Sequence, residues 1–218
     1  MKRIKRKQLK GDELVTTISK LLRFLQERTK QIVTLMVVIL FVILVFAGNR
    51  FIKARQNKKE SHVLGQIFSL GSELNSKPEN VQKLEELGGS GRFSRVAYIV
   101  LATHWMEKGE LEKAEASLEK MNKSPKDIFY YQAQDLLAQI HSKQKNYDKA
   151  IEIYQKIEEE DPKEYSLAVI LFNRAEVLEE KGEIEEALAF YKRVQEEFPQ
   201  AYYSFDASQK IRELEAKK

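Results

Sequence analysis

Three stretches of this chain share one spacing of small and large residues. They start at Arg95, Tyr131 and Ala168 and can be aligned without gaps. Alanine stands at position 8 and again at position 20 of every copy, which gives Ala102, Ala138, Ala175, Ala114, Ala150 and Ala187. Position 24 is large and position 27 is apolar, which gives Leu118, Tyr154, Tyr191, Met121, Ile157 and Val194. A repeat of this length predicts stacked structural units, because one such unit cannot bury its own apolar face.

The spacing within each copy indicates a pair of antiparallel helices. Two helices approach closely where their facing residues are small, so we expect the alanine at position 8 to meet the alanine at position 20. The large residue at position 24 would fill the space toward the next pair. Pro162 and Pro199 follow the second helix of the second and third copies, where proline ends a helix, and Pro125 stands one position early in the first copy. Gly109 and Gly182 occupy the turn of the first and third copies.

These residues resemble the tetratricopeptide repeat (TPR), and the resemblance covers about half of the chain. It implies an all-α fold, a TPR-like α-solenoid of helix pairs, with residues Tyr203 to Ala216 as a closing helix. The copies depart from the family in three ways. The position-20 alanines are 36 and 37 residues apart rather than 34, position 4 lacks the frequent tryptophan, and Arg174 takes the place of leucine at position 7.

A second feature is the uncharged stretch from Ile32 to Gly48. Its seventeen residues would form a helix about 25 Å long, at the short end of what spans a bilayer. Thirteen of them are Leu, Ile, Val or Phe, which favour insertion by roughly 5 kcal/mol. The alternatives are a buried core helix, a pair of buried strands, or a signal peptide cleaved near Ala47. The 31 residues before the stretch are too many for an ordinary signal peptide, so we expect a transmembrane helix.

Charge divides the chain into unlike parts. Residues 1–31 carry ten Lys/Arg and three acids (+7), residues 49–59 carry five basic residues and no acid (+5), and residues 60–218 carry 22 basic residues and 30 acids (−8). The basic flanks favour contact with anionic lipid. The acidic folded part disfavours nucleic-acid binding. The larger basic count on the N-terminal side favours a cytoplasmic N-terminus, although the counts close to the span almost tie.

The sequence therefore predicts five segments. They are a basic cytoplasmic tail with an amphipathic juxtamembrane helix (1–31), the transmembrane helix (32–48), a helical spacer (49–93), three TPR-like repeats (94–200) and a C-terminal capping helix (201–218). The amphipathic helix, over residues 12–30, would lie on the membrane surface or pack against another subunit.

This order of segments is similar to that of the YfgM-like family of membrane-anchored repeat proteins. The residues that carry the similarity are Phe24 to Arg50, the spacer, and the passage from Leu84 to Ala114. The resemblance implies a bacterial inner-membrane protein with one span. It also implies a repeat domain in the periplasm that is ancillary to the SecYEG translocon and lies beside periplasmic chaperones.

No catalytic or cofactor-binding pattern is found in the sequence. The chain has no cysteine, which removes thiolate metal sites and cysteine nucleophiles. Its three histidines, His62, His104 and His141, lack the further ligands that a zinc site needs. The glycine-rich run from Gly88 to Arg92 lacks the lysine and the preceding strand of a phosphate-binding loop. We therefore expect a protein that is not an enzyme and that uses no cofactor or metal.

The concave side of the solenoid is the candidate binding groove. Positions 2, 5, 9, 12 and 13 of the first helices would line it, and the residues we select are Val96, Ile99, Thr103, Met106, Gln132, Asp135, Gln139, Val169, Phe172, Glu176, Glu179 and Glu180. This surface grades from apolar to acidic, which predicts a polypeptide with an apolar anchor and basic residues. A clamp for an acidic C-terminus needs Lys, Arg and Asn at these positions, so the sequence disfavours that mode of binding. The alternative is that the chain's own spacer helices cover the groove.

The sequence predicts a membrane-tethered scaffold in the bacterial envelope that binds protein partners. The resemblance points to translocon subunits, a chaperone or an unfolded polypeptide as those partners. Two alternatives remain open. The first is a coordinator of cell division or peptidoglycan synthesis, or an outer-membrane-assembly scaffold, of the same architecture. The second is an accessory subunit of an enzyme or transporter complex. The sequence leaves the oligomeric state open.

Overall fold

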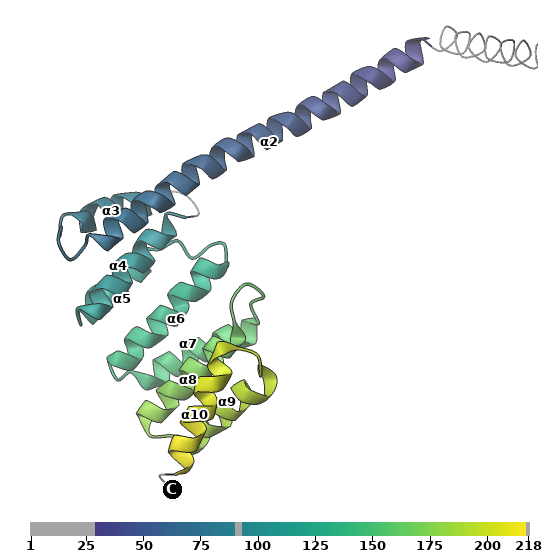
Figure 1. Ribbon diagram of the computed structural model, residues 1–218. Coiled ribbons are helices and arrows are strands. Elements are labelled where there is room, and N and C mark those ends of the chain that lie inside the picture. Colours follow the sequence, from purple (N-terminus) through teal and green to yellow (C-terminus); the bar gives the residue numbers. More distant parts are fainter. Residues whose placement is uncertain (1–28, 90–92, 217–218) are drawn as a thin grey trace, which may run out of the picture. The chain divides into compact units, whose positions relative to one another are not determined.

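A computed structural model describes residues 29–89 and 93–216 of the chain (Figure 1). For residues 29–40, 52–54 and 56–59 it describes the backbone alone. The chain divides into two units, residues 1–58 and residues 59–218. The predicted basic tail and the predicted amphipathic helix lie outside the described residues, except for their last two or three positions.

The described residues form nine helices and no strand. Their bounds are α2 (Thr29–Ser72), α3 (Asn80–Gly88), α4 (Arg95–Glu107), α5 (Leu111–Glu119), α6 (Ile128–Lys143), α7 (Tyr147–Glu160), α8 (Leu167–Lys181), α9 (Ile184–Glu197) and α10 (Tyr202–Glu215). This all-helical architecture is that of a TPR-like solenoid, as the repeats predict.

The three repeats form three helix pairs, α4 with α5, α6 with α7 and α8 with α9 (Figure 1). All six repeated alanines are fully buried, with none of their surface exposed. Ala102 and Ala114 belong to one buried cluster, Ala138 and Ala150 to a second, and Ala175 and Ala187 to a third. Tyr154 and Tyr191 at position 24 are fully buried as well. The helix α10 packs on α9 and closes the last cluster with Ala207, Ile211 and Leu214.

The end of the spacer belongs to the folded unit that contains the repeats. Ile67 of α2 and Leu84 of α3 are fully buried in the same cluster as the first helix pair. The helices come close because glycine leaves room. A Cβ added at Gly71 would lie 2.8 Å from Cγ1 of Val100, and one added at Gly88 would lie 2.6 Å from the ring of Tyr98. The spacer therefore extends the solenoid by two helices on the N-terminal side of α4.

The turn between the two helices of each repeat has a left-handed residue at position 15. Gly109 and Gly182 take φ angles of 75° and 91° there, and Lys145 takes 63° in the second repeat. A side chain makes this backbone region unfavourable by about 1 kcal/mol, whereas glycine adopts it freely. The second repeat thus keeps the geometry of the turn with a less suitable residue.

Lys145→Gly is therefore expected to stabilise the repeat unit by about 0.5–1 kcal/mol. Glycine removes the strain of the left-handed backbone, and its greater entropy in the unfolded chain offsets part of this gain. Urea denaturation of the full chain in detergent, followed by circular dichroism, measures the change. Lys149→Gly, inside α7, is the matched control and should destabilise the unit by about 1 kcal/mol. A loss of stability for Lys145→Gly would contradict the prediction.

The predicted transmembrane helix falls within α2. In the part of the chain whose side chains are described, no helix combines the length and the hydropathy needed to cross a bilayer. Residues 32–40 of the predicted span lie outside that part. The side chains from Phe41 to Phe46 are described, and each exposes between 52% and 77% of its surface.

Candidate protein-binding groove

The first helices of the repeats, α4, α6 and α8, carry the predicted groove residues, and two pockets open along them. The N-terminal pocket, of about 440 Å³, is lined by α2, α4 and the first turns of α6. The acidic pocket, of about 710 Å³, is lined by α6, α8, the segment 164–166 and single residues of α7 and α10. Both pockets lie within the unit formed by residues 59–218.

The spacer closes over part of the N-terminal pocket. Val96, Ile99, Thr103 and Gln132 line this pocket together with Leu64 and Phe68 of α2. Val96 and Ile99 are buried. The spacer therefore forms one side of this end of the groove, which still opens as a pocket of about 440 Å³.

The acidic pocket brings together most of the other predicted residues. Asp135, Gln139, Val169, Phe172, Glu176 and Glu180 all line it. Met106 and Glu179 line neither pocket. The carboxylate of Glu179 accepts hydrogen bonds from the Tyr191 hydroxyl at 2.9 Å and from the Lys210 ammonium at 3.0 Å, so it is directed toward α9 and α10.

Asp135 forms the floor of the acidic pocket and exposes only 6% of its surface. Its carboxylate accepts hydrogen bonds from the hydroxyl of Tyr154 at 2.9 Å, the hydroxyl of Tyr165 at 2.8 Å and the amide of Asn173 at 2.9 Å. Burial, and then the adjacent Asp135 carboxylate, raise the pKa of both tyrosines well above the ordinary value. The two hydroxyls therefore remain protonated donors at every physiological pH.

The repeat pattern predicted Asp135 as a groove residue but did not predict its hydrogen-bond donors. Tyr154 is the position-24 residue of its repeat, where a packing role was predicted, and its hydroxyl adds a polar role. Tyr165 lies in the segment between α7 and α8, and Asn173 lies on α8 next to the predicted position 5. No short-range pattern connects these residues with Asp135, since the bonds span 19 to 38 positions of the chain.

Acidic side chains of α8 form one wall of the pocket. Glu180 accepts a short hydrogen bond from the Ser142 hydroxyl of α6, and Glu176 is half-buried. Burial raises the pKa of Glu176, Lys210 opposes the rise, and the carboxylates of Glu179, Glu180 and Asp206 add to it. Folding therefore disfavours the ionised form of Glu176 relative to the unfolded chain.

Glu176→Gln is therefore expected to stabilise the unit at pH 7. A carboxyl whose pKa is raised by folding favours the folded state below its unfolded pKa and disfavours it as the pH rises through the folded value. The melting temperature should rise by about 1–2 °C, the size that a few tenths of a kcal/mol produce in a domain of this length. The difference from the wild type should shrink as the pH falls toward 4. Glu152→Gln, at an exposed position of α7, is the control and should change nothing.

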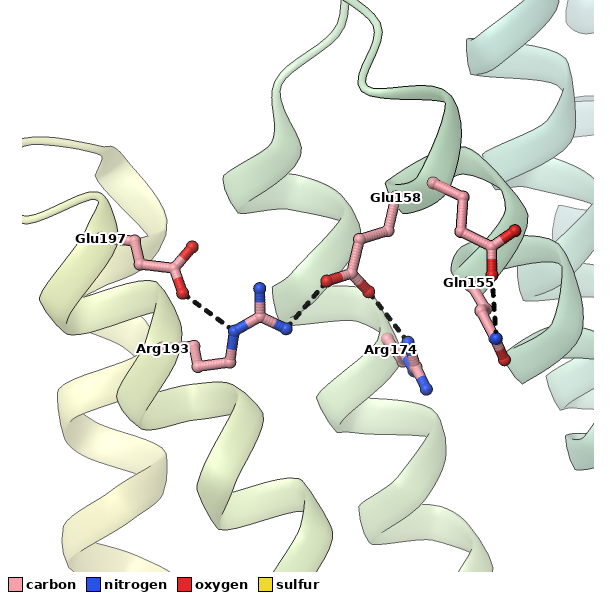
Figure 2. A network of polar contacts seen from close by, with 6 residues as sticks. Gln155, Glu158, Arg174, Arg193 and Glu197 are labelled. Atoms are coloured by element: carbon pink, nitrogen blue, oxygen red, sulfur yellow. Dashed lines mark hydrogen bonds and ion pairs between the residues drawn. The ribbon is translucent and has the colours of Figure 1, made fainter.

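Arg174 lies on the other side of α8 and explains one departure from the repeat pattern. Its guanidinium donates to Glu158 at 2.9 Å, and Glu158 also accepts from Arg193 at 2.8 Å (Figure 2). The guanidinium also lies over the Phe190 ring, 4.3 Å from its centroid. Arginine can therefore replace leucine at position 7, because its guanidinium pairs with Glu158 of α7 and lies over the Phe190 ring of α9. This network stabilises the stacking of the repeats and lies apart from the groove.

The histidines do not gather into a metal site. In the described part of the chain no group of three His, Cys, Asp or Glu side chains is close enough to hold a metal ion. His62 is exposed, His104 is buried with its pKa lowered chiefly by that burial, and His141 lies beside Glu115 and Gln144. Each histidine has its own separate surroundings.

Comparison with known proteins identifies the family. The model of the tetratricopeptide repeat-like domain matches residues 23–214, which is most of the chain. The chain belongs to the tetratricopeptide repeat-like family. A TPR-like fold is typically a non-catalytic scaffold for protein interactions.

Two solved structures align with this chain at low sequence identity. A structure of MamA from AMB-1 is 16% identical and aligns over 72% of this chain and 87% of its own, with a TM-score of 0.45. The structure of BtubC (BKLC) from P. vanneervenii is 19% identical and aligns over 72% of this chain and 62% of its own, with a TM-score of 0.40. Among curated protein sequences, none matches this one.

Proposed function

We propose that this protein is a non-enzymatic, membrane-tethered scaffold that binds polypeptide partners in the bacterial envelope. The observation that carries the proposal is the acidic pocket on the concave side of the repeats, with a volume of about 710 Å³. That volume is typical of a binding site rather than of a packing defect. The pocket offers an apolar anchor site at Val169 and Phe172. It also offers a polar rim, formed by the carboxylates of Glu176 and Glu180.

The membrane tether is supported by the exposed apolar side chains of α2. The six consecutive residues Phe41 to Phe46 each expose more than half of their surface, on every side of the helix. An exposed apolar surface of this kind is unfavourable in water and favourable in lipid. The uncharged residues 32–40 precede it and Arg50 follows it, which is the order expected for a helix that ends at a headgroup region.

A role beside protein translocation is the most specific form of the proposal. The YfgM-like arrangement of tail, span, spacer and repeats supports it, and the family match from residue 23 onward includes the predicted span together with the repeats. In that arrangement the N-terminus is cytoplasmic and the repeats are periplasmic. Subunits of the translocon, a chaperone or an emerging polypeptide would then be the partners.

Single-cysteine labelling tests the tether and its orientation. The chain has no cysteine, so Gln8→Cys and Gln200→Cys each introduce one reporter thiol. In intact spheroplasts, a membrane-impermeant maleimide should label Gln200→Cys and should label Gln8→Cys only after permeabilisation. The reverse pattern would contradict the orientation, and recovery of the uncleaved chain in the aqueous fraction would contradict the tether.

Site-specific crosslinking tests the groove. A photoreactive amino acid at Gln139, inside the acidic pocket, should crosslink to a protein partner in intact cells, whereas the same group at Gln195 on the outer helix α9 should not. Mass spectrometry of the crosslinked product distinguishes translocon subunits and chaperones from cell-wall synthases or transporter subunits. Equal crosslinking at the two positions would remove the groove from the proposal.

A further inference from the structure

We infer that the acidic pocket binds the side chain of a lysine or arginine carried by an extended segment of the partner polypeptide. This inference deepens the proposed function and rests on it. The occupant follows from the charge of the pocket lining, the neutral surroundings of its buried carboxylate and the aromatic groups at its edge.

The lining of the pocket is strongly acidic. It contains four carboxylates, Asp135, Glu164, Glu176 and Glu180, and one ammonium group, Lys143. Lys143 is exposed at the rim, where water screens its charge, whereas Asp135 is buried at the floor. Glu164 and Glu180 are exposed as well, Glu176 is half-buried, and Asp135 alone is buried. A cationic group that enters the pocket therefore passes two screened carboxylates and then approaches Glu176 and Asp135, where the attraction is stronger than on an open surface.

The buried carboxylate of Asp135 accepts hydrogen bonds from neutral groups of the described residues. Tyr154, Tyr165 and Asn173 are all neutral donors. Two of these bonds go to Oδ1 and one to Oδ2, so Oδ2 accepts one bond fewer than Oδ1. The tyrosines hold the carboxylate in one orientation. A guest ammonium or guanidinium would complete the set of donors and supply the missing positive charge.

Aromatic rings at the side of the pocket suit the rest of such a guest. Phe172 and Tyr203 have ring centroids 5.1 Å apart, and both line the pocket with Val169. The methylene stem of a lysine or arginine packs on apolar surface while its head reaches a charged group. The face of an aromatic ring also attracts a cation directly. A neutral apolar side chain would use these rings but would leave the carboxylates desolvated and unpaired.

Selection from a random peptide library tests the inference. The full chain in nanodiscs of phosphatidylcholine is panned against displayed seven-residue peptides, with empty nanodiscs as the counter-selection. We expect the enriched peptides to carry lysine or arginine. In the best enriched peptide, replacement of that residue by methionine should weaken binding at least tenfold, as measured by fluorescence anisotropy.

Two charge-matched variants locate the binding. Glu176→Gln/Glu180→Gln should weaken binding of the best enriched peptide at least tenfold. Glu152→Gln/Glu196→Gln removes the same net charge from exposed positions of α7 and α9 and should bind the peptide like the wild type. Unchanged circular dichroism and an unchanged or higher melting temperature exclude unfolding as the cause of any loss in the first variant.

The outcomes separate the inference from the proposed function. Enriched peptides that lack basic residues, but lose affinity when Val169→Trp fills the pocket, would overturn the inference and leave the polypeptide-binding groove in place. Equal loss in the two double variants would also overturn it, since binding would then depend on net charge alone. No enrichment above empty nanodiscs would overturn both.

Discussion

Asp135→Ala is expected to destabilise the repeat unit by about 3 kcal/mol. The substitution removes the acceptor of three hydrogen bonds, from the hydroxyls of Tyr154 and Tyr165 and from the amide of Asn173. A buried donor that loses its acceptor costs about 1–3 kcal/mol. Tyr154 is fully buried, so water cannot replace the lost acceptor there, whereas Tyr165 and Asn173 are partly exposed and lose less. Relief from burying a carboxylate offsets part of the total.

Urea denaturation of the full chain in detergent, followed by far-ultraviolet circular dichroism, measures this loss. Asp148→Ala is the matched control. Its side chain is 87% exposed and pairs with Lys181 at the surface, so its loss should stay below about 0.5 kcal/mol. Asp135→Asn separates charge from hydrogen bonding, since it retains one acceptor oxygen and should lose less than Asp135→Ala. Similar stability of Asp135→Ala and Asp148→Ala would contradict the assigned role.

The same carboxylate links stability with function. Asp135 connects α6 with α7 through Tyr154 and with α8 through Asn173, so it fixes the relative position of two repeats at the floor of the groove. A hydrocarbon side chain here would avoid the cost of burying a charge but would leave three donors without an acceptor. The carboxylate thus has a structural role, and the peptide experiment tests its role in ligand binding separately from folding.

The helix pairs and their packing could be predicted from the sequence because they depend on short-range spacing. Ala102 and Ala114, for example, are placed by the helical period and by the length of one turn. The left-handed Lys145 could have been anticipated in the same way, since Gly109 and Gly182 mark its position in the other repeats. Periodicity determines which face of each helix is buried, and this was sufficient for the fold.

The parts of the groove that could not be predicted depend on contacts between distant residues. Nothing in the local sequence shows that Leu64 and Phe68 of the spacer line the N-terminal pocket, because that placement follows from how α2 packs on α4. The direction of Glu179 is set by donors on α9 and α10, 12 and 31 positions further along the chain. Arg174 departs from the repeat pattern, and only the folded structure brings Glu158 and Phe190 into contact with it.

The junction between the first and second repeats contains a buried ion pair. The guanidinium of Arg95, at the start of α4, lies 2.5 Å from the carboxylate of Asp127 and donates to the carbonyl of Pro125 at 3.0 Å. Only 3% of the arginine side chain is exposed. Asp127 also caps α6, since its other oxygen accepts from the backbone amides of Phe129 at 3.2 Å and Tyr130 at 3.4 Å. One carboxylate thus starts a helix and neutralises a buried cation.

Asp127→Asn is expected to destabilise the repeat unit by about 3 kcal/mol, although asparagine is an equally good helix cap. The amide leaves the buried guanidinium facing a neutral group, and removing one member of a buried pair typically costs 3–5 kcal/mol. Arg95→Met/Asp127→Asn should be more stable than Asp127→Asn alone, because the double variant also removes the buried positive charge and keeps the cap. Urea denaturation compares the variants, with Glu85→Gln at the exposed Lys120 pair as a control that should change stability by less than about 0.5 kcal/mol. A double variant less stable than the single one would show that Arg95 acts mainly by packing, and the ion pair would then not be what joins α4 to α6.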